Sequence, residues 1–136
     1  MASLDLSIDE VVTVASMIER EAANDSERAR IASVIYNRLA ANMPLGLEST
    51  ILYAHPEHEG APTAEMIAED SPYNTLNHTG LPPTPICNPG RASIMAALSP
   101  ETTNYYYFTL DTDTGMHRFF TNYAEFEAFV ATQNYG

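Results

Sequence analysis

Prolines divide this chain into parts that can and cannot form long regular elements. Five of the nine prolines lie within residues 71–90. Proline has a fixed φ and no backbone N–H, so no long helix or central strand can cross this segment. A loop of such length is usually either functional or disordered. The prolines favour a rigid functional loop, because they lower the entropy lost when the segment becomes ordered.

A helical pattern begins near the N-terminus. Ser7 and Glu10 have the spacing of a capping box, which predicts a helix start. The apolar residues that follow recur at helical spacing, at Ile8, Val11, Val12, Ala15, Ile18 and Ala22. At about 100° per residue, Glu19 and Glu21 flank this apolar stripe. The same geometry predicts that three polar side chains face outward, those of Thr13, Ser16 and Arg20.

A second helix is predicted from about Ser26 to Ala41, with Ile31, Val34, Ile35 and Leu39 on its buried face. Residues 55–70 are polar and acidic and are expected at the surface, with short helical turns at 50–54 and 64–68. Beyond the proline-rich segment, a third helix is predicted over Arg91–Leu98. It is followed by a β-prone run at Asn104–Leu110.

The C-terminal part predicts a hairpin and a last helix. The loop of the hairpin is residues 111–115, and its returning strand is Met116–Thr121. Asn122 and Glu125 have the spacing of a helix cap. The order of elements is two helices, an irregular half, a helix, a hairpin and a closing helix. It predicts an α+β fold that is mainly helical and excludes an alternating parallel α/β pattern.

Charge and composition exclude several classes of function. The chain has a net charge of −12 and six arginines but no lysine. Nucleic acid and anionic membrane surfaces would be repelled, whereas a neutral or mixed-charge polymer such as a glycan is compatible. Pyridoxal phosphate chemistry needs a lysine amine and is excluded. With Cys87 alone, no internal disulfide or cysteine metal cluster is possible. No run reaches the roughly 18 apolar residues of a membrane span.

Glu21 is the candidate catalytic group. It lies one helical turn beyond Met17 and Ile18, where partial desolvation would raise the pKa of its carboxyl group. A carboxyl group with a raised pKa can act as a general acid and base. The alternative is a solvated charge on a helix face. His55 and His58 have a spacing seen in metal sites, but Pro56 prevents a helix there and no third ligand is in register. No metal or other cofactor is expected.

An ordered set of motifs covers nearly the whole chain from about Leu6 onward. The set comprises residues 15–21 (ASMIERE), 27–34 (ERARIASV), 36–39 (YNRL), 73–75 (YNT), 80–83 (GLPP), 88–90 (NPG), 105–108 (YYYF) and 117–121 (HRFFT). Together these motifs resemble the endolytic murein transglycosylases of the MltG (YceG-like) family. No single motif carries this resemblance; its specificity comes from their order.

The resemblance implies a bacterial cell-wall enzyme with a lysozyme-like catalytic domain, here residues 1–136. Such an enzyme cleaves the MurNAc–GlcNAc β-1,4 bond within peptidoglycan glycan strands and leaves 1,6-anhydro-MurNAc ends. Members usually also carry an N-terminal membrane anchor and a LysM-like subdomain, and neither is expected within these residues. The implied location of the whole protein is the extracytoplasmic face of the plasma membrane. Cell-wall synthases are the implied protein partners.

The resemblance places the catalytic role on Glu21. Glu19 is expected to be structural, pairing with an arginine of the second helix. Glu48 is a candidate second carboxylate for substrate contact. It stands where the family commonly has aspartate after Leu-Gln-(Ser/Thr). The alternative is a loop charge without a role in the site. The remaining expected site residues are Tyr73, Asn74 and Thr75 as sugar contacts or turn formers, Pro82 as groove wall, His117 as packing or substrate contact, and Asn37 and Arg38 as support behind Glu21.

Two other functions remain compatible with the same residues. One is a hydrolytic muramidase on the same fold, in which Glu48 activates water, as a second carboxylate does in ordinary glycosidases. The other is a glycan-binding module without catalytic activity. The products of glycan digestion distinguish the first alternative, and substitution of Glu21 distinguishes the second.

Overall fold

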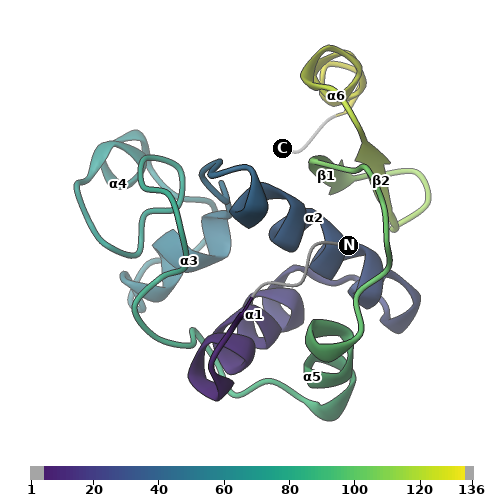
Figure 1. The fold of residues 1–136 in the computed structure, drawn as a ribbon. Coiled ribbons are helices and arrows are strands. Elements are labelled where there is room, and N and C mark those ends of the chain that lie inside the picture. Colours follow the sequence, from purple (N-terminus) through teal and green to yellow (C-terminus); the bar gives the residue numbers. More distant parts are fainter. Residues whose placement is uncertain (1–4, 134–136) are drawn as a thin grey trace.

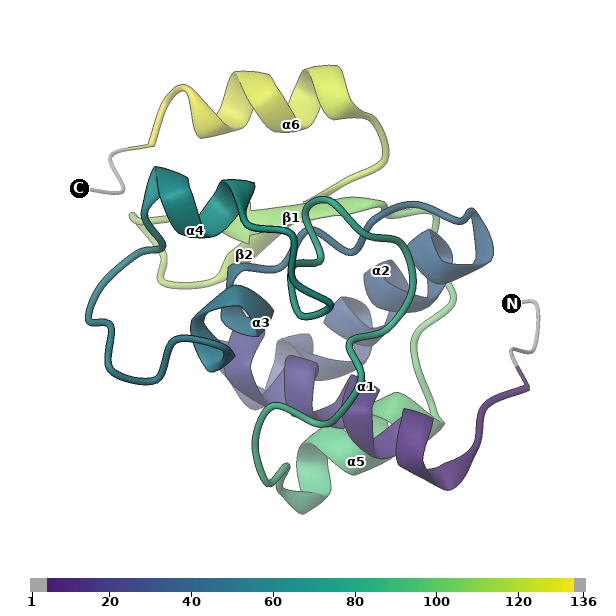
Figure 2. The same cartoon turned by 90° about the vertical axis from the view of Figure 1, so that its left-hand side faces the viewer.

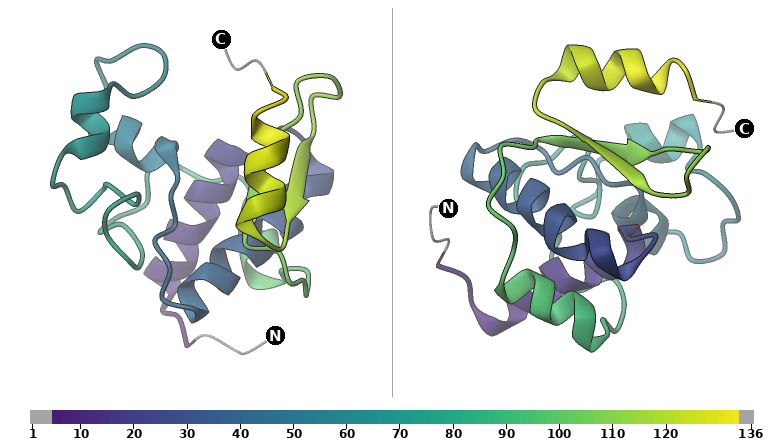
Figure 3. Two further views of the ribbon diagram at one scale, coloured as in Figure 1. Left: turned by 90° about the horizontal axis from the view of Figure 1, so that it is seen from above. Right: turned by 90° about the vertical axis from the view of Figure 1, so that its right-hand side faces the viewer.

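The computed structural model describes residues 5–133 and has the predicted α+β architecture. In chain order its elements are α1 (Ile8–Glu21), a 3₁₀ turn (Asp25–Glu27), α2 (Arg28–Ala40), α3 (Glu48–Tyr53), α4 (Ala64–Ala68), α5 (Arg91–Leu98), β1 (Tyr107–Leu110), β2 (His117–Phe120) and α6 (Tyr123–Val130). Figure 1 shows these elements along the chain. The side views show α6 over the hairpin, then α2 and α1, with α5 on the opposite side (Figures 2 and 3).

Helix α1 lies at the centre of the fold and packs against α5, α2 and α3. It begins with the predicted capping box, in which the Ser7 side chain accepts from the Glu10 backbone N–H and the Glu10 side chain accepts in return. The main hydrophobic cluster forms where α1 meets α2 and α5, and its fully buried members include Met17, Ile18 and Ile31. Burying these side chains is the main favourable contribution to folding here.

The predicted orientation of α1 was wrong at three positions. Thr13 and Ser16 were expected to face outward but are buried, and Ile8 was expected in the buried stripe but is 84% exposed. Because several elements cover α1, its polar side also faces protein. Ser16 Oγ donates to the Thr13 carbonyl at 2.7 Å and accepts from the Ile86 N–H at 3.0 Å, so its burial leaves no polar group unpaired.

The hairpin is antiparallel, with Tyr107 opposite Phe120 and Leu110 opposite His117. Its first strand is shorter than the predicted 104–110 run, because the partner strand ends at Phe120 and Asn122 then caps α6. The proline-rich segment runs across α1 (Figure 2), where Ile86 and Cys87 both hydrogen-bond to Ser16. This arrangement leaves the C-terminal end of α1 between the α3 side and the hairpin side of the molecule (Figure 3).

Candidate functional site

A cavity of about 580 Å³ lies at the C-terminal end of α1. Its wall is built from segments far apart in the sequence: the end of α1, α2, the segment before α3, the hairpin and α6. Among its lining residues are four of the predicted site residues, namely Glu21, Arg38, Glu48 and His117. The fold therefore brings two carboxylates, a histidine and an arginine around one space large enough for part of a sugar chain.

Glu21 is the last residue of α1 and is partly buried. Burial raises the pKa of its carboxyl group, and the nearby Glu48 carboxylate acts in the same direction. The Ser49 hydroxyl and the positive charges of His117 and Arg20 oppose this rise but do not cancel it. Ser49 Oγ is buried and has no hydrogen-bond partner of good geometry among the described residues. A carboxyl group held in this way can give up a proton and take it back.

Glu48 is the first residue of α3, and its side chain is exposed at the cavity. The segment that carries it is held from behind by Thr75. Thr75 Oγ1 accepts from the Leu47 N–H at 2.9 Å and also hydrogen-bonds to Thr50. Glu48 thus has a fixed backbone next to Glu21, and its role toward substrate stays a prediction.

His117 is the first residue of β2, and its side chain is only 9% exposed. Its Nδ1 lies 2.8 Å from Glu27 Oε2, and its backbone N–H donates to Glu27 Oε1. Glu27 is 1% exposed. Burial acts to raise the pKa of Glu27, but the hydrogen bonds and charge of His117 lower it by more, so this carboxylate stays ionised at neutral pH.

Glu27 is the functional candidate that the sequence analysis missed. Its sequence position suggests only a favourable charge near a helix N-terminus. The partner lies 90 residues away, so neither spacing nor periodicity could connect them. The only available signal was that both residues belong to motifs of the same family resemblance.

Arg38 forms part of the cavity wall. Its Nε donates to the Tyr106 carbonyl at 2.6 Å, and Nη1 donates to the Pro44 carbonyl at 2.8 Å. The guanidinium also lies 4.9 Å from the centre of the Tyr107 ring. Arg38 therefore joins α2 to the hairpin and to the segment that leads to Glu48.

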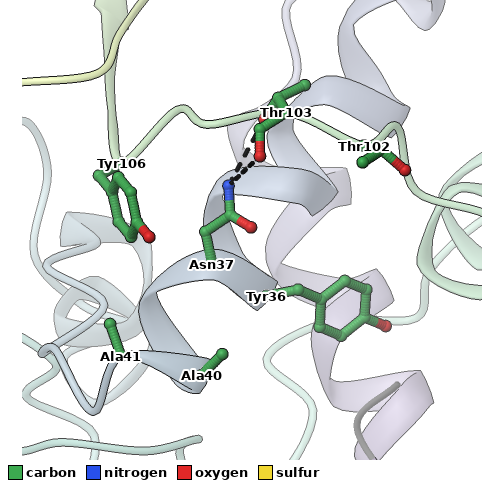
Figure 4. A pocket seen from close by; sticks show the side chains of 7 residues that line it. All are labelled: Tyr36, Asn37, Ala40, Ala41, Thr102, Thr103 and Tyr106. Carbon is green, nitrogen blue, oxygen red and sulfur yellow. Dashed lines mark hydrogen bonds between the residues drawn. The ribbon is translucent and has the colours of Figure 1, made fainter. Parts of the chain in front are cut away.

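Asn37 lies at a different place from the one predicted. Its Nδ2 donates to the backbone carbonyls of Thr103 and Tyr105 at 3.0 and 2.8 Å. It lines a separate pocket of about 240 Å³ together with Tyr36 and Tyr106 (Figure 4). Consecutive residues of a helix point about 100° apart, so Asn37 and Arg38 face different surroundings. Asn37 supports the irregular segment that precedes β1, and it is not among the residues that line the Glu21 cavity.

Glu19 has the expected structural role. Its Oε1 accepts from the Gly90 N–H at 2.8 Å and from Ser93 Oγ at 3.0 Å. The predicted ion pair with α2 is present, with 3.8 Å between Glu19 Oε2 and Arg28 Nη1. The Gly90 hydrogen bond is the main cause of a lowered pKa at Glu19. Glu19 therefore fastens α1 to the start of α5.

The proline-rich segment contributes less to this cavity than predicted. Asn74 and Thr75 are buried, and Asn74 Nδ2 donates to the carbonyls of Ile67 and Glu69, both at 2.8 Å. Their polar atoms are used inside the protein, so the geometry gives them a structural role in place of the predicted sugar contact.

Tyr73 and Pro82 also lie outside the lining of the Glu21 cavity. Tyr73 packs its ring 5.3 Å from that of Tyr53. Pro82 is buried and lines a separate pocket of about 410 Å³ beside Leu39. His55 and His58 have different partners, Glu69 Oε1 and the Ala61 carbonyl.

Comparisons with known proteins agree with the motif resemblance. The model of the YceG-like family matches residues 1–132. An endolytic murein transglycosylase of Bacillus subtilis (strain 168) is 47% identical over 103 residues, which are 76% of this chain and 29% of that protein. An endolytic murein transglycosylase of Streptococcus pneumoniae serotype 2 is 34% identical over 134 residues, 95% of this chain and 24% of that protein.

A crystal structure of a yceG-like protein from Listeria monocytogenes has the same fold. It superposes with a TM-score of 0.85 at 44% identity and covers 90% of this chain and 40% of that one. The chain thus spans less than a third of the length of the two curated relatives.

Proposed function

The chain belongs to the YceG-like family, and from this premise we propose that it carries the catalytic part of a peptidoglycan lytic transglycosylase. The substrate is the glycan strand, cleaved at the MurNAc–GlcNAc β-1,4 bond. The most direct support comes from the surroundings of Glu21. Burial raises the pKa of its carboxyl group, and the residue lines a cavity of suitable size. The names of the relatives, endolytic murein transglycosylases, agree with it.

The proposed reaction needs one acid and base and no water. Protonated Glu21 gives its proton to the glycosidic oxygen as the bond to C1 of MurNAc breaks. The C6 hydroxyl of the same sugar then attacks C1, and the Glu21 carboxylate takes the hydroxyl proton. The products are a free GlcNAc hydroxyl and a 1,6-anhydro-MurNAc end, and Glu21 returns to its starting state. The Ser49 hydroxyl and the charge of His117 stabilise the carboxylate form between the two steps.

A hydrolytic muramidase is the second candidate, because Glu48 lines the same cavity as Glu21 and a second carboxylate could activate water. The two reactions are separated by digesting uncrosslinked glycan strands and weighing the products. Anhydro ends lack one water relative to reducing ends. Anhydro ends are expected, and reducing ends alone would show that the transglycosylase proposal is wrong.

Substitution of Glu21 tests whether the chain is an enzyme or a silent binding module. Glu21→Gln keeps the size of the side chain but cannot donate a carboxyl proton, so turnover should fall by about 10²-fold or more. Glu65→Gln, an exposed glutamate on α4, is the matched control and should cleave normally. Full activity in Glu21→Gln would exclude it as the acid. Binding of glycan by the unchanged protein without any cleavage would favour the module.

For the whole protein we infer a place at the extracytoplasmic face of the bacterial membrane, because peptidoglycan lies there. Within residues 5–133, no helix combines the length and the apolar character needed to span a bilayer. An anchor outside this chain and contacts with cell-wall synthases are part of the same proposal. Both are tested by fractionation and crosslinking of the full-length protein.

A further inference from the structure

The contact between Glu27 and His117 constrains the proton positions on the imidazole ring. Glu27 is ionised, so its oxygens can only accept hydrogen bonds. With Glu27 Oε2 2.8 Å from Nδ1, that ring nitrogen must carry a proton. Nε2 is then the nitrogen that the ring can offer to the cavity, which His117 lines together with Glu21.

We propose that Glu27 is a positioning residue for the reaction at Glu21: it holds His117 in one ring orientation, with a proton on Nδ1 and with Nε2 directed to the Glu21 cavity. The inference rests on the proposed function, since it assigns a role within the same site. His117 acts on the Glu21 carboxyl group through its charge, and Glu27 acts through His117 without touching the substrate.

Attaching the hairpin to α2 does not explain both hydrogen bonds between Glu27 and His117. The bond from the His117 backbone N–H to Glu27 Oε1 already fixes β2 against the start of α2. The second bond, to Nδ1, fixes only the side chain. A buried carboxylate carries a large desolvation cost, and an apolar contact would hold two elements together at least as well. The imidazole ring of His117 is therefore the group whose position depends on the ionised Glu27.

The held ring has a defined task in the proposed reaction. When Glu21 has given its proton to the leaving oxygen, it is a partly buried carboxylate that needs a nearby positive charge. The groups that act on it are Arg20 beside it, Glu48 and Ser49 from α3, and His117 from β2. Of these, Glu48 opposes the ionised form. The charge of His117 favours the ionised form of Glu21 from the hairpin side.

Glu27→Gln tests the proposal. Glutamine presents one carbonyl oxygen and one NH₂ group to two N–H donors, so it cannot accept from both the backbone N–H and the Nδ1–H of His117 as the two carboxylate oxygens do. On uncrosslinked glycan strands, kcat should fall about tenfold or more, with KM changed by less than about threefold. An unchanged kcat in folded Glu27→Gln would overturn the proposal. Tyr36→Phe is the control, because it removes a buried hydrogen bond to the Ala97 carbonyl away from this cavity and should keep its kcat.

A second measurement needs neither turnover nor a folded Glu27 variant. Nitrogen-15 NMR of the unchanged protein should show that Nδ1 of His117 carries a proton. Carbon-13 titration should show a higher midpoint for Glu21 in His117→Gln than in the unchanged protein, because the variant lacks the nearby positive charge. An equal or lower midpoint, or a His117 ring without a proton on Nδ1, would overturn the proposal. Absence of anhydro products would instead count against the proposed function and leave these readings intact.

Discussion

Two glutamates on one helix show how strongly local surroundings set the chemistry of a residue. Glu19 and Glu21 are separated by one residue. A backbone N–H from Gly90 is the main cause that lowers the pKa of Glu19, and burial is the main cause that raises the pKa of Glu21. The first carboxylate is held by hydrogen-bond donors as part of the scaffold. The second is kept ready to hold a proton, which is the property that acid catalysis needs.

The raised pKa of Glu21 predicts a cost in stability. A carboxyl group whose pKa is higher in the folded state destabilises the fold as pH rises above its unfolded value of 4.5. Glu21→Gln removes that cost, so at pH 7 its Tm should exceed that of the unchanged protein by a few degrees. The difference should shrink below about pH 4.5, where both side chains are neutral. Thermal melts across this range check the prediction, and a lower Tm at pH 7 would contradict it.

At the scale of elements, a single carboxylate fastens α1 to α5. Glu19→Ala removes the bonds from Gly90 and Ser93 and the ion pair with Arg28. We expect a loss of roughly 1–2 kcal/mol in the free energy of unfolding, measured by urea denaturation. Asp25→Ala also removes an acidic partner of Arg28, but Asp25 is 83% exposed, so its loss should stay below about 0.5 kcal/mol. Equal effects of the two variants would contradict this.

The central position of α1 predicts a second contrast within one helix. Met17 is fully buried in the main cluster, whereas Ile8 is exposed in the first turn. Met17→Ala should cost about 2–5 kcal/mol, because it removes buried contacts and leaves a cavity. Ile8→Ala should change stability by no more than about 0.5 kcal/mol. Denaturation of both variants measures this, and a comparable loss in each would show that the described packing of α1 is wrong.

For the whole molecule, the dominant electrostatic fact is the net charge of −12. Repulsion among these charges works against the compact state, and salt screens it. Raising NaCl from about 10 to 300 mM at pH 7 should therefore raise Tm. Near pH 4.4, the isoelectric point, the same addition should have little effect. A salt response of equal size at both pH values would show that specific ion effects dominate.

The sequence by itself determined the order of the elements and the catalytic candidate, because these depend on short-range information. The capping box of α1, the span Arg91–Leu98 and the Asn122 cap all follow from residues a few positions apart. The motif resemblance selected Glu21 over Glu19 as the catalytic candidate. The family model that matches residues 1–132 is that of the same family.

Only the tertiary structure decided which polar groups face the cavity and which face protein. Thr13 and Ser16 became buried because other elements cover α1 on more than its apolar stripe. Asn74 was expected at a sugar or in a turn, and its side chain instead donates to the backbone at the end of α4. Glu27 meets His117 across 90 residues of chain. Such contacts are set by the packing of whole elements, and no local pattern of side chains encodes them.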